Sequence, residues 1–148
     1  MSGARAGLLM LTVAAVACAR ADGPVEIAVG QDACASCRMV FTSTTTAAEI
    51  VAPGELPLLF DDLGCLRDYL QAHPLGGASA LYVREHRRQA WIDGRRAAYS
   101  QLVAAATPMG SGLLAHDDAA SRDRDPAARG ATPIELTRVL GPASGARP

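Results

Sequence analysis

The sequence predicts an α+β fold in which one small α+β unit is duplicated. Two observations support this prediction. Short runs of strand length, bounded by Gly and Pro, recur along the chain, and apolar residues at helical spacing lie between some of them. In chain order the segments read strand, strand, helix, strand, and then strand, helix, strand, helix. Strands and helices interspersed in this order are typical of one compact α+β unit.

Two strands are expected before the first helix. Cys37, Met39 and Phe41 alternate with other residues, and in an extended strand this alternation places Cys37 and Met39 on one face, roughly 7 Å apart. Pro53-Gly54 then marks a turn, and residues 56–60 read as the second strand.

The first helix is expected to run from Asp61 or Asp62, either of which can serve as its N-cap, to about Ala72. Its apolar stripe consists of three leucines: Leu63, Leu66 and Leu70. Cys65 falls in the first turn, where the helix dipole favours a thiolate and the neighbouring acids oppose it.

The second half of the chain is expected to contain, in order, strands at 80–85 and 90–92, a helix at 95–105, a loop at 107–112 and a strand at 113–116. Residues 117–131 are charged and contain Gly and Pro, which indicates a linker. Thr132 then resembles the N-cap of a last helix, with Pro133 at its first position and Gly141 at its end.

Residues 1–17 read as a signal peptide for export. The single charge at Arg5 precedes an apolar run that is short for a membrane span. The run ends in Ala-Val-Ala-Cys, which resembles a lipobox, so Cys18 is the expected lipidation site. Cleavage near Ala21, as in a protein without a lipid, is the alternative. With lipidation, residues 18–32 form a tether, and the protein is periplasmic and anchored to a membrane of the cell envelope.

Composition argues against several classes of function. The chain has 148 residues and a net charge of −1, and no basic cluster stands out, so nucleic acid is not an expected partner. About 130 residues remain after the signal peptide, enough for one domain. The sequence has no nucleophile elbow, phosphate loop or zinc-protease helix, and we do not expect an enzyme.

Sulfur is concentrated in three turn-rich blocks, at residues 34–39, 60–65 and 107–110. If Cys18 is lipidated, three cysteines remain: Cys34, Cys37 and Cys65. An odd number does not suit a disulfide framework, so either one thiol is free or a ligand shields all three. Met39 and Met109 add thioethers, which are good ligands for Cu(I) and poor ones for zinc. The blocks therefore predict a Cu(I) site on an exported protein.

Other interpretations of these residues stay open at this point. Cys34 and Cys37 form a Cys-x-x-Cys motif, which also serves zinc sites, dithiol redox centres and local disulfides. Both methionines can instead be packing residues. Among the three histidines, His116 is the one expected near the metal, because it ends a strand that follows the Met109 loop.

Taken together, the blocks resemble the nitrous-oxide reductase accessory lipoprotein family, NosL. The resemblance spans residues 33–116. It rests on Cys34-x-x-Cys-x-Met, Phe60-Asp-Asp-Leu-Gly-Cys-Leu, Trp91-Ile-Asp-Gly with a downstream Tyr99, and Thr107-Pro-Met-Gly-Ser-Gly. Arg38 stands where the family motif usually has a small residue.

The resemblance implies an α+β fold of two similar ββαβ-type halves, distantly like the organomercurial lyase fold. It implies a copper-binding domain over 33–120, followed by a linker and C-terminal helix over 121–148. It also implies a Cu(I) metallochaperone that serves nitrous oxide reductase or a related copper enzyme, with an ABC-type assembly complex as partner. The expected copper ligands are Met39, Cys65 and Met109, joined by Cys34 and Cys37. The alternative function is a Cys-x-x-Cys thiol oxidoreductase that supports copper-site assembly.

Overall fold

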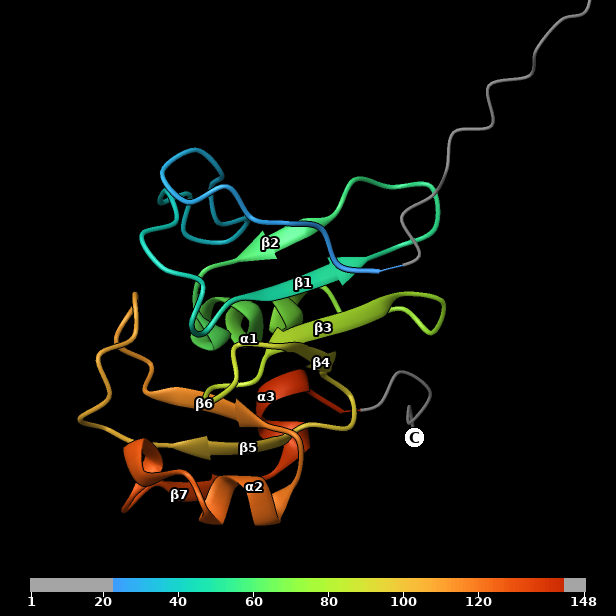
Figure 1. Cartoon of the computed structure of the whole chain (residues 1–148). Helices are drawn as coiled ribbons and strands as arrows, with labels where there is room; N and C mark the ends of the chain where they lie inside the picture. Colours follow the sequence, from blue (N-terminus) through green and yellow to red (C-terminus); the bar gives the residue numbers. More distant parts are fainter. Residues whose placement is uncertain (1–22, 143–148) are drawn as a thin grey trace, which may run out of the picture.

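Two small antiparallel sheets and a few short helices make up the part of the chain that the computed structural model describes, residues 23–142 (Figure 1). This confirms a mixed α+β fold. The expected signal peptide over 1–17 and the expected lipidation site at Cys18 lie outside the described residues, as does the end of the chain from 143 to 148.

The first sheet has four strands in the order β2-β1-β3-β4. Their bounds are Ala48–Val51 for β1, Leu58–Phe60 for β2, Ala80–Arg84 for β3 and Trp91–Asp93 for β4. Helix α1, Leu63–Ala72, follows β2 and begins after the N-cap residue Asp62. The three leucines of its expected apolar stripe are all buried, which places this face of the helix in the hydrophobic core.

The second sheet has three strands in the order β6-β5-β7. Their bounds are Ala98–Gln101 for β5, Leu113–His116 for β6 and Thr132–Ile134 for β7. Between β6 and β7 lie helix α2, Ala119–Asp123, and the 3₁₀ helix η1, Pro126–Ala128. Helix α3, Leu136–Leu140, ends the described chain.

The two sheets share an order of elements. In each, a hairpin of two strands is followed by helix, and the next strand then pairs with the free side of the first strand. The sheets meet where Glu85 bridges Ala115 and the His86 N–H donates to the carbonyl of Ala115 at 2.8 Å. Helix α3 packs on α1 and buries Val139 (Figure 1), so the halves share one core.

Most expected elements are confirmed: the second strand, the first helix, and the strands that became β3, β4 and β6. The helix expected over 95–105 is wrong, because Ala98–Gln101 is the central strand β5 of the second sheet. Tyr99 and Ser100 are both buried there, whereas Val103, within the range of the expected helix, is 91% exposed. A central strand buried on both faces lacks the alternation that distinguishes it from a helix.

The strand expected over 37–41 is also wrong. The Cys34 N–H donates to the carbonyl of Met39 at 2.9 Å, and the Arg38 N–H donates to that of Cys34 at 3.0 Å, so the segment closes into a tight turn. Arg38 has a φ of 66°, in the left-handed region. Cys37 and Met39 therefore do not lie on one face of an extended strand.

Near the C-terminus the structure is more ordered than the expected linker. Residues 117–131 contain α2 and η1, each with an aspartate N-cap. Thr132 and Pro133 belong to β7 instead of capping a helix, and α3 begins later, after Glu135. Pro133 is tolerated because β7 is an edge strand, where a missing N–H leaves no gap in the ladder.

Gly112 offers a test of the packing that precedes β6. It has a φ of 65°, and a Cβ there would overlap the carbonyl oxygen of Leu102; Gly130 has a φ of 84° and open space around it. We expect Gly130→Ala to lower the free energy of unfolding by about 1–2 kcal/mol, for the left-handed backbone alone. Gly112→Ala should lower it by about 2–4 kcal/mol, since overlap adds to strain. Urea unfolding measures both, and equal losses would contradict the close packing of this loop.

Candidate metal centre

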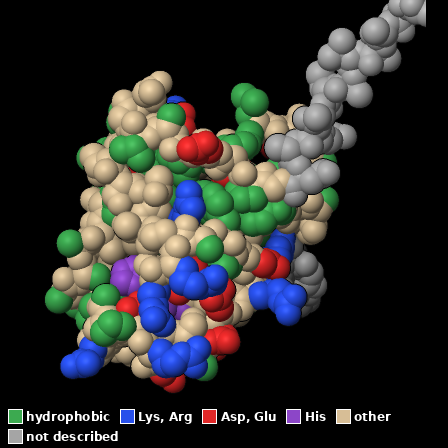
Figure 2. All heavy atoms as spheres, viewed as in Figure 1, with side chains coloured by type: hydrophobic (Ala, Val, Ile, Leu, Met, Phe, Trp, Pro, Cys, Tyr) green, Lys and Arg blue, Asp and Glu red, His purple; other side chains and the backbone are tan. Residues whose placement is uncertain are grey.

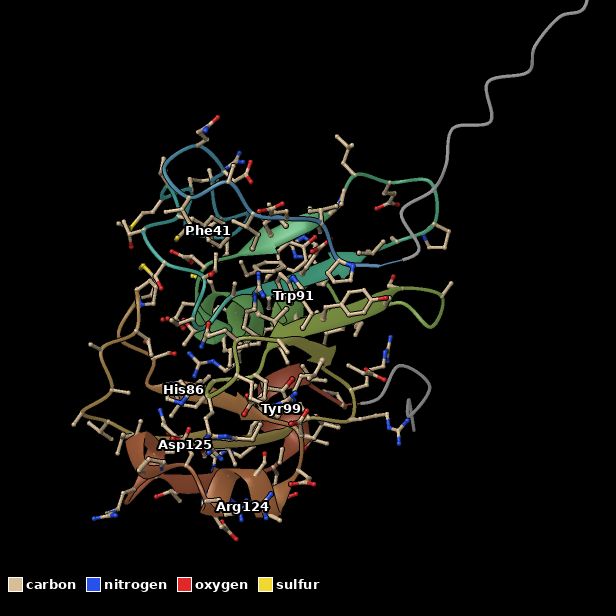
Figure 3. All side chains as sticks on the ribbon, in the orientation of Figure 1. Phe41, His86, Trp91, Tyr99, Arg124 and Asp125 are labelled. Carbon is tan, nitrogen blue, oxygen red and sulfur yellow. The ribbon has the colours of Figure 1, made fainter. Side chains whose placement is uncertain are left out.

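The three cysteines of the described chain come together with one carboxylate. Cys34, Cys37, Cys65 and Asp61 each offer a donor atom, and these four atoms all lie within 4.8 Å of one another. We call this group the sulfur cluster. All three cysteines are free thiols. Sulfur atoms gather at the left of Figure 3, where the blue N-terminal loop approaches the loop between β5 and β6.

A tight turn presents the first two cysteines. Backbone hydrogen bonds between Cys34 and Met39 close the turn, and the Ala35 N–H donates to the carbonyl of Leu59 at 2.7 Å, which ties it to β2. Cys34 is completely buried, whereas Cys37 is half-buried. One thiol of the pair thus lies in the core and the other near the surface.

The start of α1 supplies the other two members. Asp61 is buried, its backbone carbonyl accepts a hydrogen bond from the Thr46 hydroxyl at 3.0 Å, and its carboxylate oxygens lie 3.7 and 3.8 Å from the Cys37 sulfur as acceptors. Cys65, 6% exposed, stands in the first turn of the helix. The residue next to the N-cap therefore faces the thiols and leaves capping to Asp62.

Asp62 connects the helix to the loop that carries Met109. Its Oδ1 accepts the Gly64 N–H at 2.6 Å as the N-cap bond, and its Oδ2 accepts the Met109 N–H at 2.8 Å. The side chain is completely buried. Burial alone would raise its pKa, but hydrogen bonds from Ser111, Gly64 and Met109 outweigh that effect, so the pKa is lowered.

The loop and the helix also touch directly at Gly64. A Cβ at this position would lie 2.6 Å from the Cβ of Ser111. Only glycine lets the Met109 loop approach the helix start this closely without a shift. The Gly in Asp-Asp-Leu-Gly-Cys is thus explained by packing against Thr-Pro-Met-Gly-Ser-Gly.

Both methionines are exposed, 53% for Met39 and 46% for Met109. Neither fills a gap in the core, so the interpretation of them as packing residues loses its support. Their backbones adjoin the sulfur cluster: Met39 closes the cysteine turn, and Met109 is bonded to Asp62, next to Asp61. Two exposed thioethers are therefore carried by segments that border this cluster.

The two buried thiols of the sulfur cluster, Cys34 and Cys65, have raised pKa values. Burial raises the pKa of Cys65, and the neighbouring Cys34 adds to the effect. Burial likewise raises the pKa of Cys34, although backbone hydrogen bonds from Cys37 and Asp61 oppose it. Among the described residues, no ion pair includes Asp61. A metal ion that displaces the thiol protons would supply the missing positive charge.

His116 does not belong to the sulfur cluster. It lies at the end of β6, completely buried, and its Nε2 lies 3.2 Å from the Ser100 hydroxyl. Its nearest charged groups are Glu85 and Asp125. Burial lowers the His116 pKa, and those carboxylates only partly compensate. The sequence analysis did not identify Asp61 as a member of the cluster. It interpreted Asp61 only as a possible N-cap of the first helix.

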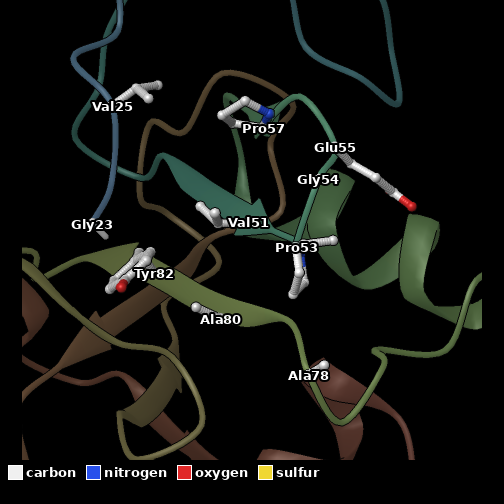
Figure 4. A pocket seen from close by; sticks show the side chains of 11 residues that line it. Gly23, Val25, Val51, Pro53, Gly54, Glu55, Pro57, Ala78, Ala80 and Tyr82 are labelled. Carbon is white, nitrogen blue, oxygen red and sulfur yellow. The ribbon is translucent and has the colours of Figure 1, made fainter. Parts of the chain in front are cut away.

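A hollow of about 470 Å³ lies elsewhere, at the end of the first sheet. Its lining includes Val25, Val51, Pro53 and Tyr82, and Figure 4 shows these side chains around it. The lining is mostly apolar and contains no cysteine, methionine or histidine. It is therefore separate from the sulfur cluster and offers no ligands for a soft metal.

Comparisons with protein-family models, with curated proteins and with solved structures find no match to this chain. Within residues 23–142, no helix has both the length and the apolar character needed to cross a bilayer.

Asp62 can be tested by substitution. Asp62→Asn keeps the size of the side chain but replaces one of two accepting oxygens by an NH₂ group, so one N–H, of Gly64 or Met109, loses its partner. We expect the free energy of unfolding at pH 7 to fall by about 1–3 kcal/mol. Because the folded pKa is lowered, the stabilisation by Asp62 is present above about pH 4 and is lost as the pH falls through the folded value.

The variant should therefore lose less stability than the wild type on acidification from pH 6 to pH 2, measured by urea unfolding at each pH. Asp68→Asn is the matched control, since Asp68 is an exposed residue of the same helix, paired only with Arg67. Parallel pH profiles for the wild type and Asp62→Asn would contradict the role of this carboxylate.

Thiol reactivity tests the burial pattern. In the folded, reduced protein we expect iodoacetamide to label Cys37 before Cys34 and Cys65, because only Cys37 is more than marginally exposed. Peptide mapping by mass spectrometry assigns each label, and labelling in urea should remove the order. Equal labelling rates for the three cysteines in the folded protein would contradict this burial pattern.

Proposed function

We propose that this protein is a periplasmic, membrane-anchored Cu(I) metallochaperone that delivers copper for the maturation of nitrous oxide reductase or a related copper enzyme. The observation that carries the proposal is the convergence of three free thiols from residues 34–37 and 65, beside two segments that hold exposed methionines. The membrane anchor and the destination come from the resemblance to the NosL family and from the lipobox at Cys18.

The donor set favours Cu(I) over zinc. Cu(I) is a soft ion, for which thiolate and thioether ligands are well suited. Zinc could use the three thiols and Asp61, but it would gain nothing from Met39 or Met109. Met39 and Met109 carry exposed thioethers on segments far apart in sequence, and the backbones of both segments adjoin the sulfur cluster, an arrangement that suits a soft metal better than packing.

The candidate donors differ in solvent exposure, and this difference suits the transfer of a metal to another protein. Cys34 and Cys65 are buried and hold their positions in the core, while Cys37, Met39 and Met109 are half-buried or exposed. A receiving protein can approach the exposed donors and replace them one at a time, so copper passes through shared-ligand intermediates without release to water. Thioethers suit an oxidising compartment because they do not form disulfides.

Two structural features support the proposed family. Its two ββαβ-type halves match the element order of the two sheets, β2-β1-β3 with α1 and β6-β5-β7 with α2. The family's small residue between the second Cys and Met is accounted for by the φ of 66° at Arg38, a conformation that glycine adopts at less cost. In this proposal the partners are the copper-receiving enzyme and an ABC-type assembly complex.

A thiol oxidoreductase is the second candidate, because Cys34 and Cys37 are free thiols in a Cys-x-x-Cys motif. Its chemistry needs an accessible thiolate with a lowered pKa. Here burial raises the pKa of Cys34, and the more exposed Cys37 faces the Asp61 carboxylate instead of a cation. The local electrostatics therefore favour metal binding over dithiol exchange.

A Cu(I) titration against a chromophoric competitor, under reducing conditions, tests the function. We expect the wild type to take up Cu(I) at sub-micromolar free copper and Cys65→Ser to lose most of this uptake. Met39→Ala and Met109→Ala should each weaken binding by roughly tenfold, about 1.4 kcal/mol. Copper X-ray absorption on the loaded protein should show sulfur as the dominant neighbour.

The matched control is Val103→Ala, an exposed apolar residue of the same loop as Met109, which should bind like the wild type. No uptake by the wild type at sub-micromolar free copper would refute the metallochaperone. Disulfide reductase activity that survives the loss of both methionines, together with absent Cu(I) uptake, would establish the oxidoreductase instead.

A further inference from the structure

A second group of polar side chains lies buried between the two halves. It consists of Glu85 and His86, which follow β3, His116 at the end of β6, and Asp125 before η1. Figure 3 labels His86 and Asp125, which lie toward the left of the second sheet, and a hydrogen bond joins their side chains at 2.7 Å. None of these residues is a member of the sulfur cluster. The proposed copper function does not use them.

His116 is the centre of this group and has an unsatisfied nitrogen. The side chain is completely buried, and within the described part of the chain its Nδ1 has no hydrogen-bond partner. The nearest charged atoms are Glu85 Oε1 and Asp125 Oδ2, each 3.9 Å from Nδ1. These distances are too long for hydrogen bonds, so Nδ1 faces both carboxylates without a bond to either.

Each carboxylate is already oriented toward His116 by the backbone. Glu85 Oε2 accepts the Arg88 N–H, which leaves Oε1 facing the ring. Asp125 Oδ1 accepts the Ala127 N–H at 2.9 Å, which leaves Oδ2 on the same side. His86 Nδ1 lies 2.7 Å from that Oδ2 and holds it further in place.

The other nitrogen of His116 has a partner of the kind that metal-bound histidines have. With the ring proton on Nε2, this nitrogen donates to the Ser100 hydroxyl oxygen at 3.2 Å. The Nδ1 lone pair then points at two carboxylate oxygens. In this tautomer a lone pair and two carboxylates are directed into one space, an arrangement that a bound cation would stabilise.

We propose that His116, Glu85 and Asp125 bind a divalent cation of borderline softness, Zn²⁺ or Cu²⁺, with His86 as the positioning residue for Asp125. Imidazole and carboxylate ligands suit these ions, whereas Cu(I) prefers the sulfur cluster. Three protein donors leave a fourth position for water. The chain thus has two separate sites of different chemical character, and this second one does not depend on the copper function.

Two of the three donor separations are near what such an ion needs. A tetrahedral Zn²⁺ with bonds of about 2.1 Å holds neighbouring donors about 3.4 Å apart. The two 3.9 Å separations at His116 must therefore close by about half an ångström. The donors of this group, unlike those of the sulfur cluster, are not all within 4.8 Å of one another. The two carboxylates must therefore also move toward each other when the ion binds.

His86 is the member of this group that reaches the protein surface. Its side chain is 23% exposed, while those of His116 and Asp125 are at most 2% exposed. Histidine atoms reach the surface on the face shown in Figure 2, beside arginines.

Co²⁺ is the probe that separates the two sites, because thiolate ligands produce strong near-ultraviolet charge-transfer bands and nitrogen–oxygen ligands produce only weak visible bands. Titration of the full chain, kept reduced, should show a component of the second kind. We expect His116→Gln and Asp125→Asn each to lower the affinity of this component by about tenfold or more. The charge-transfer bands of the sulfur cluster should stay unchanged in both variants.

His73→Gln is the matched control, since His73 is an exposed histidine stacked on Tyr69, outside this group. Asp125→Asn keeps the test decisive if His116→Gln fails to fold, and Zn²⁺ should raise the melting temperature of the wild type and His73→Gln more than that of Asp125→Asn. The proposal is overturned by a wild type without a nitrogen–oxygen component, or by one that Asp125→Asn leaves unchanged. Neither result bears on Cu(I) uptake by the cysteines.

Discussion

The carboxylate of Asp62 is the interaction on which the candidate metal centre depends. It is buried, and a buried carboxylate is costly unless hydrogen bonds satisfy it. Here it caps α1 with one oxygen and holds the Met109 backbone with the other. The start of α1 and the Met109 loop, more than forty residues apart in sequence, are thereby held together by one side chain. The turn that carries Cys34 and Cys37 is bonded to β2 and forms the remaining part of the site. Without this carboxylate, the Met109 backbone would lose the hydrogen bond that holds its loop at the start of the helix.

Asp61 and Asp62 have different roles, contact with the thiols and capping of the helix, and the sequence alone does not show which residue has which role. Asp61 and Asp62 have the same chemistry, and either can cap a helix. The backbone at the N-cap is extended, so successive side chains point in different directions: Asp62 turns back to the helix N–H groups, and Asp61 faces the thiols. The sequence predicted the helix and its cap region well, since apolar spacing and Asp residues are strong local signals. Tertiary contacts determine which of the two aspartates lies beside the cysteines, and these contacts cannot be read from the local sequence.

The failures of prediction have the same origin. Residues 98–101 form a strand because β6 and β7 pair with both of its edges, which no local pattern shows. The turn at Arg38 reverses the chain through a left-handed residue that is not glycine, so no glycine marks its position in the sequence. His116 was correctly placed at the end of a strand, but its partners come from residues 85, 100 and 125, which only the joining of the two halves brings together.

Charge limits how the sulfur cluster can hold copper. Three thiolates and the Asp61 carboxylate would carry four negative charges, and one Cu(I) would leave three of them uncompensated in surroundings where Cys34, Cys65 and Asp61 are buried. Binding is therefore easier if only one or two thiols lose their protons. Cu(I) still needs a second or third ligand, and a neutral thioether supplies it without adding charge. In this proposal Met39 and Met109 serve that purpose: they complete the coordination of a monovalent ion at the exposed edge of a site that cannot accept more negative charge.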